Sequence, residues 1–165
     1  MADARGPTSK IELRVLRSHH TATVREEIAQ QDLAEAMGRL FQIVNTSIAK
    51  QGVDRDGAPF ARYHSFGEVV DLEVGVMVAA PITPDGVVMS SELPAGPAAI
   101  AVHAGPYEGL GDTYDAIRRW LEASPGHQAN GGPWELYITD PSAEPDSAKW
   151  LTEVIFPLKP NAAIS

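Results

Sequence analysis

Acidic and aromatic residues alternate with apolar ones in one segment that reads as a β-strand, and their types could bind an organic cation. Successive side chains of a strand point to opposite faces of its sheet. The apolar set is Trp134, Leu136 and Ile138, which is predicted to lie under a helix. Glu135 and Tyr137 are then expected on the opposite, open face. A carboxylate beside an aromatic ring attracts a flat cation through charge pairing and cation–π interaction.

The same alternation in the other predicted strands extends the open face with two acids, an aromatic ring, a thioether and an aliphatic side chain: Glu73, Glu153, Tyr63, Met77 and Ile155. This mixture suits a partly dry site for a flat, apolar cation. Glu73 is expected to be solvated, whereas Glu153 is a candidate ligand contact. The large aromatic residues near these strands are expected to form core or groove wall, namely Trp134, Trp120, Phe60 and Phe41.

Two helices and eight strands are predicted to position these side chains. Apolar residues at helical spacing predict one helix from Asp32 to Gln51, with Gly52 at its C-terminal stop. A second apolar stripe begins at Leu110 and ends before Ser124. The strands are expected near 11–16, 21–27, 60–64, 69–78, 87–93, 98–103, 134–139 and 150–156, the first two as a hairpin.

The predicted order is strand, strand, helix, strand, strand, given twice, and the sequence repeats with it. The first predicted helix aligns with the second at four apolar-face positions, which pair Leu33, Met37, Leu40 and Val44 with Leu110, Tyr114, Ile117 and Leu121. In the strands, residues 57–63 align with 131–137, and 73–74 align with 153–154. The alignment of 73–74 with 153–154 has a larger offset because a long loop precedes the last strand. The alignment places Ala61 at the position of Glu135. Matching copies keep symmetric residues where only packing matters, so this difference favours a functional role for Glu135.

The repeats give an expected α+β fold of two tandem ββαββ modules. The first module is expected at about 11–80 and the second at about 87–160, with a turn at 81–86 between them and a flexible segment at 1–10. The two copies are expected to share a sheet or a groove and to form one ligand-binding domain from 11 to 160.

Charge and composition limit the classes of partner. Lys and Arg number 13 against 22 Asp and Glu, a formal charge of −9 that argues against nucleic-acid binding. Cysteine is absent, which excludes disulfides and thiolate metal sites. The histidines show no metal-ligand spacing, and no cofactor is predicted. No segment resembles a signal peptide or a membrane span, so a cytoplasmic location is expected.

The sequence resembles the GyrI-like small-molecule-binding family, which also provides the effector-binding domain of AraC-type and MerR-type regulators. The resemblance rests on His103-Ala104-Gly105-Pro106-Tyr107-Glu108-Gly109-Leu110 and on Gly132-Pro133-Trp134-Glu135-Leu136-Tyr137 with Asp140-Pro141. It implies two modules related by a pseudo-two-fold axis, with a ligand groove between them. It also implies that Glu135 meets the cationic part of a ligand and that Tyr107 and Tyr137 line the groove.

Three functions follow from the resemblance. The first is binding of bulky lipophilic, aromatic or cationic drug-like molecules, as a sensor or a sequestering protein. The second is hydrolysis of strained, cyclopropane-bearing DNA alkylators, with Glu135, Tyr107 and Tyr137 as catalytic residues. The third is interaction with a protein partner, as in the gyrase inhibitor that names the family. No helix-turn-helix fits before Ile11, so a stand-alone binding domain is expected.

The charge balance yields a test on DNA. Because the net charge is −9 and no basic cluster is present, the purified chain should show no sequence-selective binding of duplex DNA at physiological salt. An electrophoretic mobility shift series checks this. A sequence-selective shift would favour DNA binding over small-molecule binding as the function of the chain.

Overall fold

Alternating strands and two amphipathic helices give an α+β fold in the computed structural model, which describes residues 8–160. The order of helices and strands is the one that the sequence predicts. The principal elements are β1 (Glu12–Leu16), β2 (His19–Ala29), α1 (Leu33–Gln51), β3 (Arg55–Ser65), β4 (Val69–Val78), β5 (Met89–Leu93), β6 (Gly96–Ala104), α2 (Leu110–Glu122), β7 (Trp134–Tyr137) and β8 (Leu151–Pro157). Short 3-10 turns occupy Gln30–Asp32, Tyr107–Gly109 and Ser147–Lys149.

One compact unit covers residues 17–95. Its antiparallel strands follow the order β3-β4-β2-β5, and α1 packs on β2 and β4. Leu40, Val44 and Ile48 of α1 are buried, as their helical spacing predicts. The helix ends at Gly52, whose φ of 68° is left-handed and therefore favours glycine.

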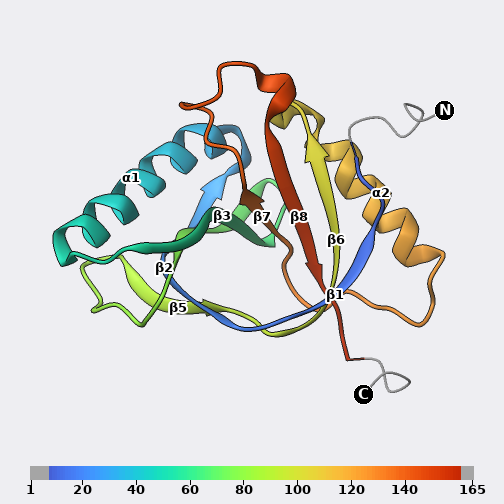
Figure 1. Cartoon of the computed structure of the whole chain (residues 1–165), viewed down its shortest axis with the longest axis horizontal. Coiled ribbons are helices and arrows are strands. Elements are labelled where there is room, and N and C mark those ends of the chain that lie inside the picture. Colours follow the sequence, from blue (N-terminus) through green and yellow to red (C-terminus); the bar gives the residue numbers. More distant parts are fainter. Residues whose placement is uncertain (1–7, 161–165) are drawn as a thin grey trace. The chain divides into compact units, whose positions relative to one another are not determined.

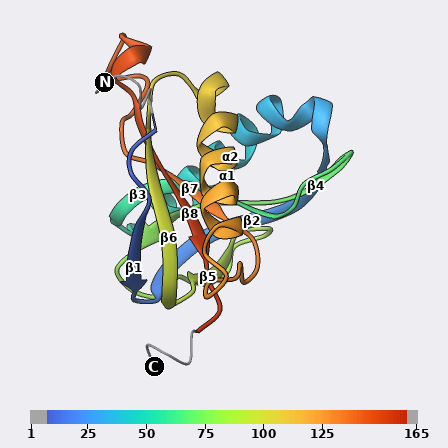
Figure 2. The same ribbon diagram turned by 90° about the vertical axis from the view of Figure 1, so that its right-hand side faces the viewer.

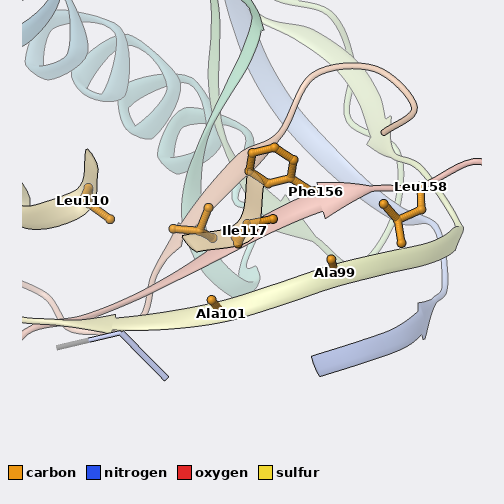
Figure 3. Close-up of a cluster of buried hydrophobic side chains, with 7 residues drawn as sticks. Ala99, Ala101, Leu110, Ile117, Phe156 and Leu158 are labelled. Atoms are coloured by element: carbon orange, nitrogen blue, oxygen red, sulfur yellow. The ribbon is translucent and has the colours of Figure 1, made fainter. Parts of the chain in front are cut away.

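The second compact unit joins residues 8–16 to 96–160. Its antiparallel strands follow the order β1-β6-β8-β7, and α2 runs along β6 and β8 (Figure 1 and Figure 2). Figure 3 shows Ile117 of α2 beside Phe156 of β8. The buried cluster that unites helix and sheet consists of Ala99, Ala101, Leu110, Ile117, Val154, Phe156 and Leu158.

The predicted hairpin of 11–16 with 21–27 is wrong. β1 pairs with β6, with Glu12 opposite Ile100, whereas β2 pairs with β4 and β5. Tight hairpins favour Asn-Gly or another glycine-containing pair in the turn. The two residues between β1 and β2 are Arg17 and Ser18, which provide no such turn. β1 therefore precedes α1 in the chain but belongs to the unit that contains α2. In the same way, β5 precedes α2 but belongs to the unit that contains α1.

Strand register agrees with the internal sequence alignment. Ala61 lies opposite Val74 in the β3–β4 pair, and Glu135 lies opposite Val154 in the β7–β8 pair. These are the positions that the two alignments match with each other. Residues 1–7 of the predicted flexible segment lie outside the described residues, whereas the Ser9 amide donates to the Val102 carbonyl at 2.8 Å.

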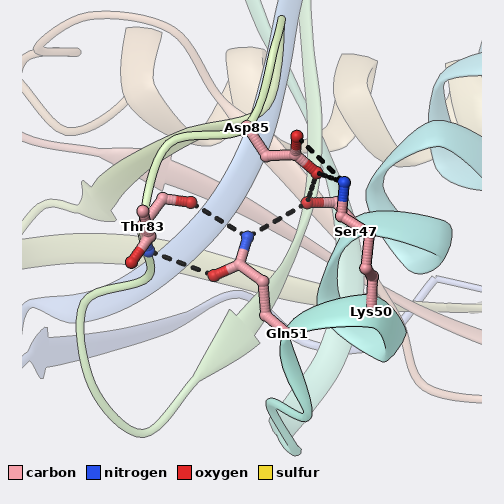
Figure 4. Close-up of polar contacts among 5 residues, drawn as sticks. All are labelled: Ser47, Lys50, Gln51, Thr83 and Asp85. Carbon is pink, nitrogen blue, oxygen red and sulfur yellow. Dashed lines mark hydrogen bonds and ion pairs between the residues drawn. The ribbon is translucent and has the colours of Figure 1, made fainter.

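Polar contacts attach the loop after β4 to the end of α1 (Figure 4). The Ser47 hydroxyl donates to Asp85 at 2.9 Å, and the Lys50 ammonium lies 3.1 Å from the same carboxylate. The hydrogen bond from Lys50, and to a smaller extent the one from Ser47, holds the pKa of Asp85 below its usual value. The Gln51 amide donates to the Thr83 carbonyl at 2.9 Å.

Among residues 8–160, no helix is long and apolar enough to cross a membrane.

Equivalent helix positions in the two units give a stability test. Leu40 and Ile117 are both fully buried and align in the repeat, so truncation of either to alanine leaves a cavity under a helix. Each substitution should lower the free energy of unfolding by about 2 to 5 kcal/mol. Denaturant melts of the two variants check this. A silent substitution at either position would show that the two helices are not packed alike.

Candidate functional site

β7 carries the predicted site residues, but its faces are the reverse of the prediction. Glu135 lies opposite Val154 of β8, which lies opposite Ala101 of β6. Directly opposed residues of neighbouring strands point to the same face. Val154 and Ala101 belong to the cluster beneath α2, so Glu135 points toward this helix as well. Tyr137, two residues on, shares that face and contacts Glu135.

The apolar pattern was misleading because β7 buries large residues on both faces. Trp134 is buried although it faces away from α2. Leu136 shares its face and is half-buried. Ile138 lies beyond the strand and is half exposed. The larger apolar set therefore does not mark the helix side of this strand.

Glu135 lies between two tyrosine hydroxyls. Glu135 is buried, with only 5% of its surface exposed. Tyr114 of α2 donates to Oε2 at 2.7 Å, and Tyr137 donates to Oε1 at 2.6 Å. Each carboxylate oxygen thus has a neutral donor. Among residues 8–160, no lysine or arginine forms an ion pair with this carboxylate.

Burial raises the pKa of Glu135 because loss of water disfavours the charged form. The hydrogen bonds from Tyr137 and Tyr114, and the interaction with His103, lower the pKa but do not offset burial. The carboxyl group therefore holds its proton to a higher pH than an exposed glutamate does. A cation placed beside it would favour the ionised form.

Aromatic rings extend the site from Glu135 toward solvent. The Tyr107 ring meets the Tyr137 ring edge-on at 5.6 Å between centroids and the Trp150 ring at 5.1 Å. Tyr107 is 36% exposed, the most accessible point of this group. Burial raises the pKa of its phenol, and the charges of Glu135 and Asp140 raise it further. We call Glu135, Tyr114, Tyr137, Tyr107 and Trp150 the tyrosine–glutamate site.

A buried histidine positions the turn that carries Tyr107. One ring nitrogen of His103, Nε2, lies 2.8 Å from the Pro106 carbonyl, and Nδ1 lies 3.2 Å from the Thr113 hydroxyl. A Cβ atom at Gly109 would lie 2.8 Å from the His103 ring, so a side chain there would displace the turn or the ring. Gly109 thus permits close packing of the turn against His103.

Three predicted site residues of the same unit, Glu153, Ile155 and Trp120, do not belong to this group. Glu153 and Ile155 lie opposite Leu136 and Trp134, on the face away from α2. Trp120 stacks on His127 with a centroid separation of 5.4 Å. The remaining predicted ligand contacts, Tyr63, Met77 and Phe60, belong to the unit of residues 17–95. Their roles in binding stay predictions.

The expectation of a solvated Glu73 is wrong. This residue is 8% exposed, and its Oε1 lies 2.8 Å from Nε2 of His64. It shares its sheet face with Arg62 and Arg25, which lie directly opposite it on β3 and β2. A carboxylate among basic side chains on a central strand can be buried at lower cost than an isolated one.

Two residues of the tyrosine–glutamate site were missed as site residues. The spacing of Tyr114 indicates only that it lies on the apolar face of the second helix, where it aligns with Met37 of the first repeat. Both positions are apolar in the first repeat and polar in the second, because Met37 aligns with Tyr114 and Ala61 aligns with Glu135. Comparison of the two repeats could therefore have identified Tyr114 together with Glu135. Trp150 follows the acidic loop, and its indole nitrogen donates to the Glu144 carbonyl at 2.8 Å. No sequence signal distinguishes it.

A buried carboxylate among aromatic rings, on a helix-covered antiparallel sheet, is a site suited to organic small molecules. Residues 10–159 match the family described as GyrI-like small molecule binding domain, and the chain belongs to this family. Its small-molecule-binding class is therefore established. No curated protein matches the sequence. Within residues 8–160, no group of three or more His, Asp or Glu side chains is arranged to hold a metal ion.

Solved structures share the fold. The EcmrR C-terminal domain superimposes with a TM-score of 0.80 at 23% identity, covering 91% of this chain and 97% of that one. EcmrR in its DNA complex gives 0.81 at 22% identity over 96% of this chain, which spans only 61% of the EcmrR chain. SAV2435 bound to tetraphenylphosphonium gives 0.63 at 14%, with coverage of 92% and 94%. A hydrolase from Listeria innocua gives 0.62 at 15%, with 96% of each chain covered.

The raised pKa of Glu135 predicts a pH-dependent gain in stability for Glu135→Gln. A folded state that binds the proton more tightly than the unfolded state loses stability as pH rises from the unfolded pKa through the folded one. The variant lacks this loss, so it should be more stable than the wild type above the folded pKa, by about 1.4 kcal/mol per pKa unit. The advantage should shrink as pH falls. Thermal melts across pH check this.

Glu122→Gln is the control, because it removes the same charge from an exposed position at the end of α2. It should change the melting temperature little at any pH. A Glu135→Gln variant that is no more stable than this control at neutral pH would contradict the inferred cost of burying Glu135.

Proposed function

We propose that this chain binds bulky aromatic cations at the tyrosine–glutamate site, as a sensing or sequestering protein for xenobiotic compounds. The observation that carries the proposal is the buried carboxylate of Glu135, which accepts hydrogen bonds from two neutral tyrosine hydroxyls and forms no ion pair with a lysine or arginine of residues 8–160. Charged groups are rarely buried unless a partner of opposite charge compensates them. A cationic ligand supplies that partner.

The surrounding side chains select the chemistry of the cation. The Tyr107 ring contacts the rings of both Tyr137 and Trp150. Aromatic faces attract cations and cover large apolar surfaces. A delocalised or shielded charge on an aromatic skeleton loses less hydration than an ammonium group when it enters such a site. The site therefore favours lipophilic cations over small hydrophilic ones.

Tyr107 lies where a ligand would enter, because it is the most exposed member of the site and its ring contacts both Tyr137 and Trp150. The ligand charge would meet Glu135 once the Tyr114 or Tyr137 hydroxyl gives up its hydrogen bond. A lipophilic cation bound to the related structure of SAV2435 supports this ligand class.

Glu135→Gln tests the proposal, with tetraphenylphosphonium as the cation and triphenylphosphine oxide as a neutral ligand of related shape. The substitution keeps the side-chain shape and removes the charge. Affinity for the cation should fall by roughly 1.5 to 3 kcal/mol, the range for hydrogen bonds that involve a charged group, while affinity for the neutral compound changes little. Calorimetric titration of both ligands measures this.

Two controls accompany the titration. Glu122→Gln should leave both affinities unchanged, since the residue is exposed at the end of α2. Wild-type affinity for the cation should rise with pH through the raised pKa of Glu135, because binding requires the ionised carboxylate. Equal losses for the cationic and the neutral ligand would contradict charge pairing at Glu135.

Hydrolysis of strained cyclopropane-bearing compounds is a second candidate function. It is favoured by a carboxylate of raised pKa in contact with two phenols, since such a group can act as general base near neutral pH. Glu135 would deprotonate a water that opens the ring, and Tyr137 or Tyr107 would donate to the oxygen on which charge develops. The related Listeria innocua structure is described as a hydrolase.

The same variant separates the two functions. For a hydrolase, Glu135→Gln should abolish turnover of a cyclopropane-bearing alkylator and leave its binding nearly intact, because the lost interaction acts in the transition state. For a binding protein, no product forms with either chain. Mass spectrometry of the reaction mixture distinguishes these outcomes.

A further inference from the structure

β1 is an edge strand that exposes apolar side chains. In the part of the chain that the structure describes, its only strand partner is β6. Leu13 is 51% exposed and Val15 is 78% exposed. Natural edge strands commonly carry charges, prolines or bulges that prevent pairing with another chain. β1 shows a regular register with β6 and contains no proline, and its two charged residues, Glu12 and Arg14, are of opposite sign.

The outward edge of β1 can be assigned from a proline on β6. Within a strand, the backbone polar groups of successive residues alternate between the two neighbours. The Pro97 carbonyl accepts from the Leu158 amide at 2.9 Å, on the side away from β1. Val15 lies opposite Pro97, so its N–H and C=O point away from β6, and those of Leu13 do the same.

The charge pattern of this edge is complementary to itself. Glu12 and Arg14 flank Leu13 and share the sheet face away from α2. Antiparallel pairing of two β1 strands about an axis at Leu13 places each Glu12 opposite the partner subunit's Arg14. Pairing about Arg14 or about Glu12 also aligns outward groups, but it opposes two like charges. Opposite charges stabilise a cross-strand pair, and like charges destabilise it.

We propose that two copies of this chain associate through their β1 strands, paired antiparallel about a two-fold axis at Leu13. The outward groups of Leu13 then bond to the partner subunit's Leu13, and those of Val15 bond to the partner subunit's Ile11. Arg14, which lies 2.7 Å from Glu12 of its own strand, exchanges this contact for the partner subunit's Glu12. The interface closes on itself and leaves no repeating edge.

The wild-type chain should show a concentration-dependent monomer–dimer equilibrium in sedimentation velocity. A five-residue strand buries less surface than the ~1,600 Å² of a standard stable interface, so a weak equilibrium is expected and a wide concentration range is needed. Low salt should strengthen association, because the charge pairs are exposed. A chain that stays monomeric throughout would overturn the proposal.

Charge reversal tests both the surface and its register. Glu12→Arg and Arg14→Glu each place like charges opposite one another at two symmetric positions, so either should weaken dimerisation by about tenfold. The double variant restores complementarity and should dimerise like the wild type. Both positions are exposed, and thermal melts confirm that each variant folds.

Mixing the two single variants is the decisive arm. Glu12→Arg chains should form heterodimers with Arg14→Glu chains, since every cross-strand pair is then complementary. Native mass spectrometry resolves the heterodimer by its mass. Dimers that neither single substitution weakens would place the interface elsewhere, and loss with Arg14→Glu alone would contradict the axis at Leu13.

Discussion

Burial of the Glu135 carboxyl group between two tyrosine hydroxyls is the constraint that the packing of α2 on its sheet must satisfy. A charged oxygen removed from water requires a donor in place, and each donor comes from a different element, α2 for Tyr114 and β7 for Tyr137. Helix and strand must therefore hold a fixed separation. The packing of Ile117 against the sheet fixes it.

The two units differ in polarity at two positions that the sequence repeat aligns. Leu40 of α1 and Ile117 of α2 align in the sequence repeat, and both are fully buried. The paired positions that would meet beneath the helix are apolar in one unit, Met37 and Ala61, and polar in the other, Tyr114 and Glu135. The polar pair is a stability liability in a packed core, which is the usual mark of a site retained for binding.

Local patterns predicted the elements well, because periodicity reports what a helix or strand buries. The α1 stripe, the Gly52 end and the β3–β4 segment all follow from spacing and turn residues. Pairing across the chain did not follow, because β1 and β2 are adjacent in sequence and alternate alike. Repeat asymmetry found Glu135, but alternation placed it on the wrong face, since β7 buries bulky residues on both sides. The ring contacts of Trp150 depend on a loop path that spacing does not encode.

The exchanged edge strands affect how the chain must fold. The unit that holds Glu135 is discontinuous, because Glu12 near the start of the chain pairs with Ile100 beyond the whole of the other unit. Its sheet cannot be completed until the intervening residues are synthesised and the distant ends meet. Non-local pairing of this kind slows folding. During translation, the backbone groups of β1 that pair with β6 would lack this partner until β6 emerges from the ribosome, so the first strand gains these hydrogen bonds only after the whole of the other unit has been synthesised.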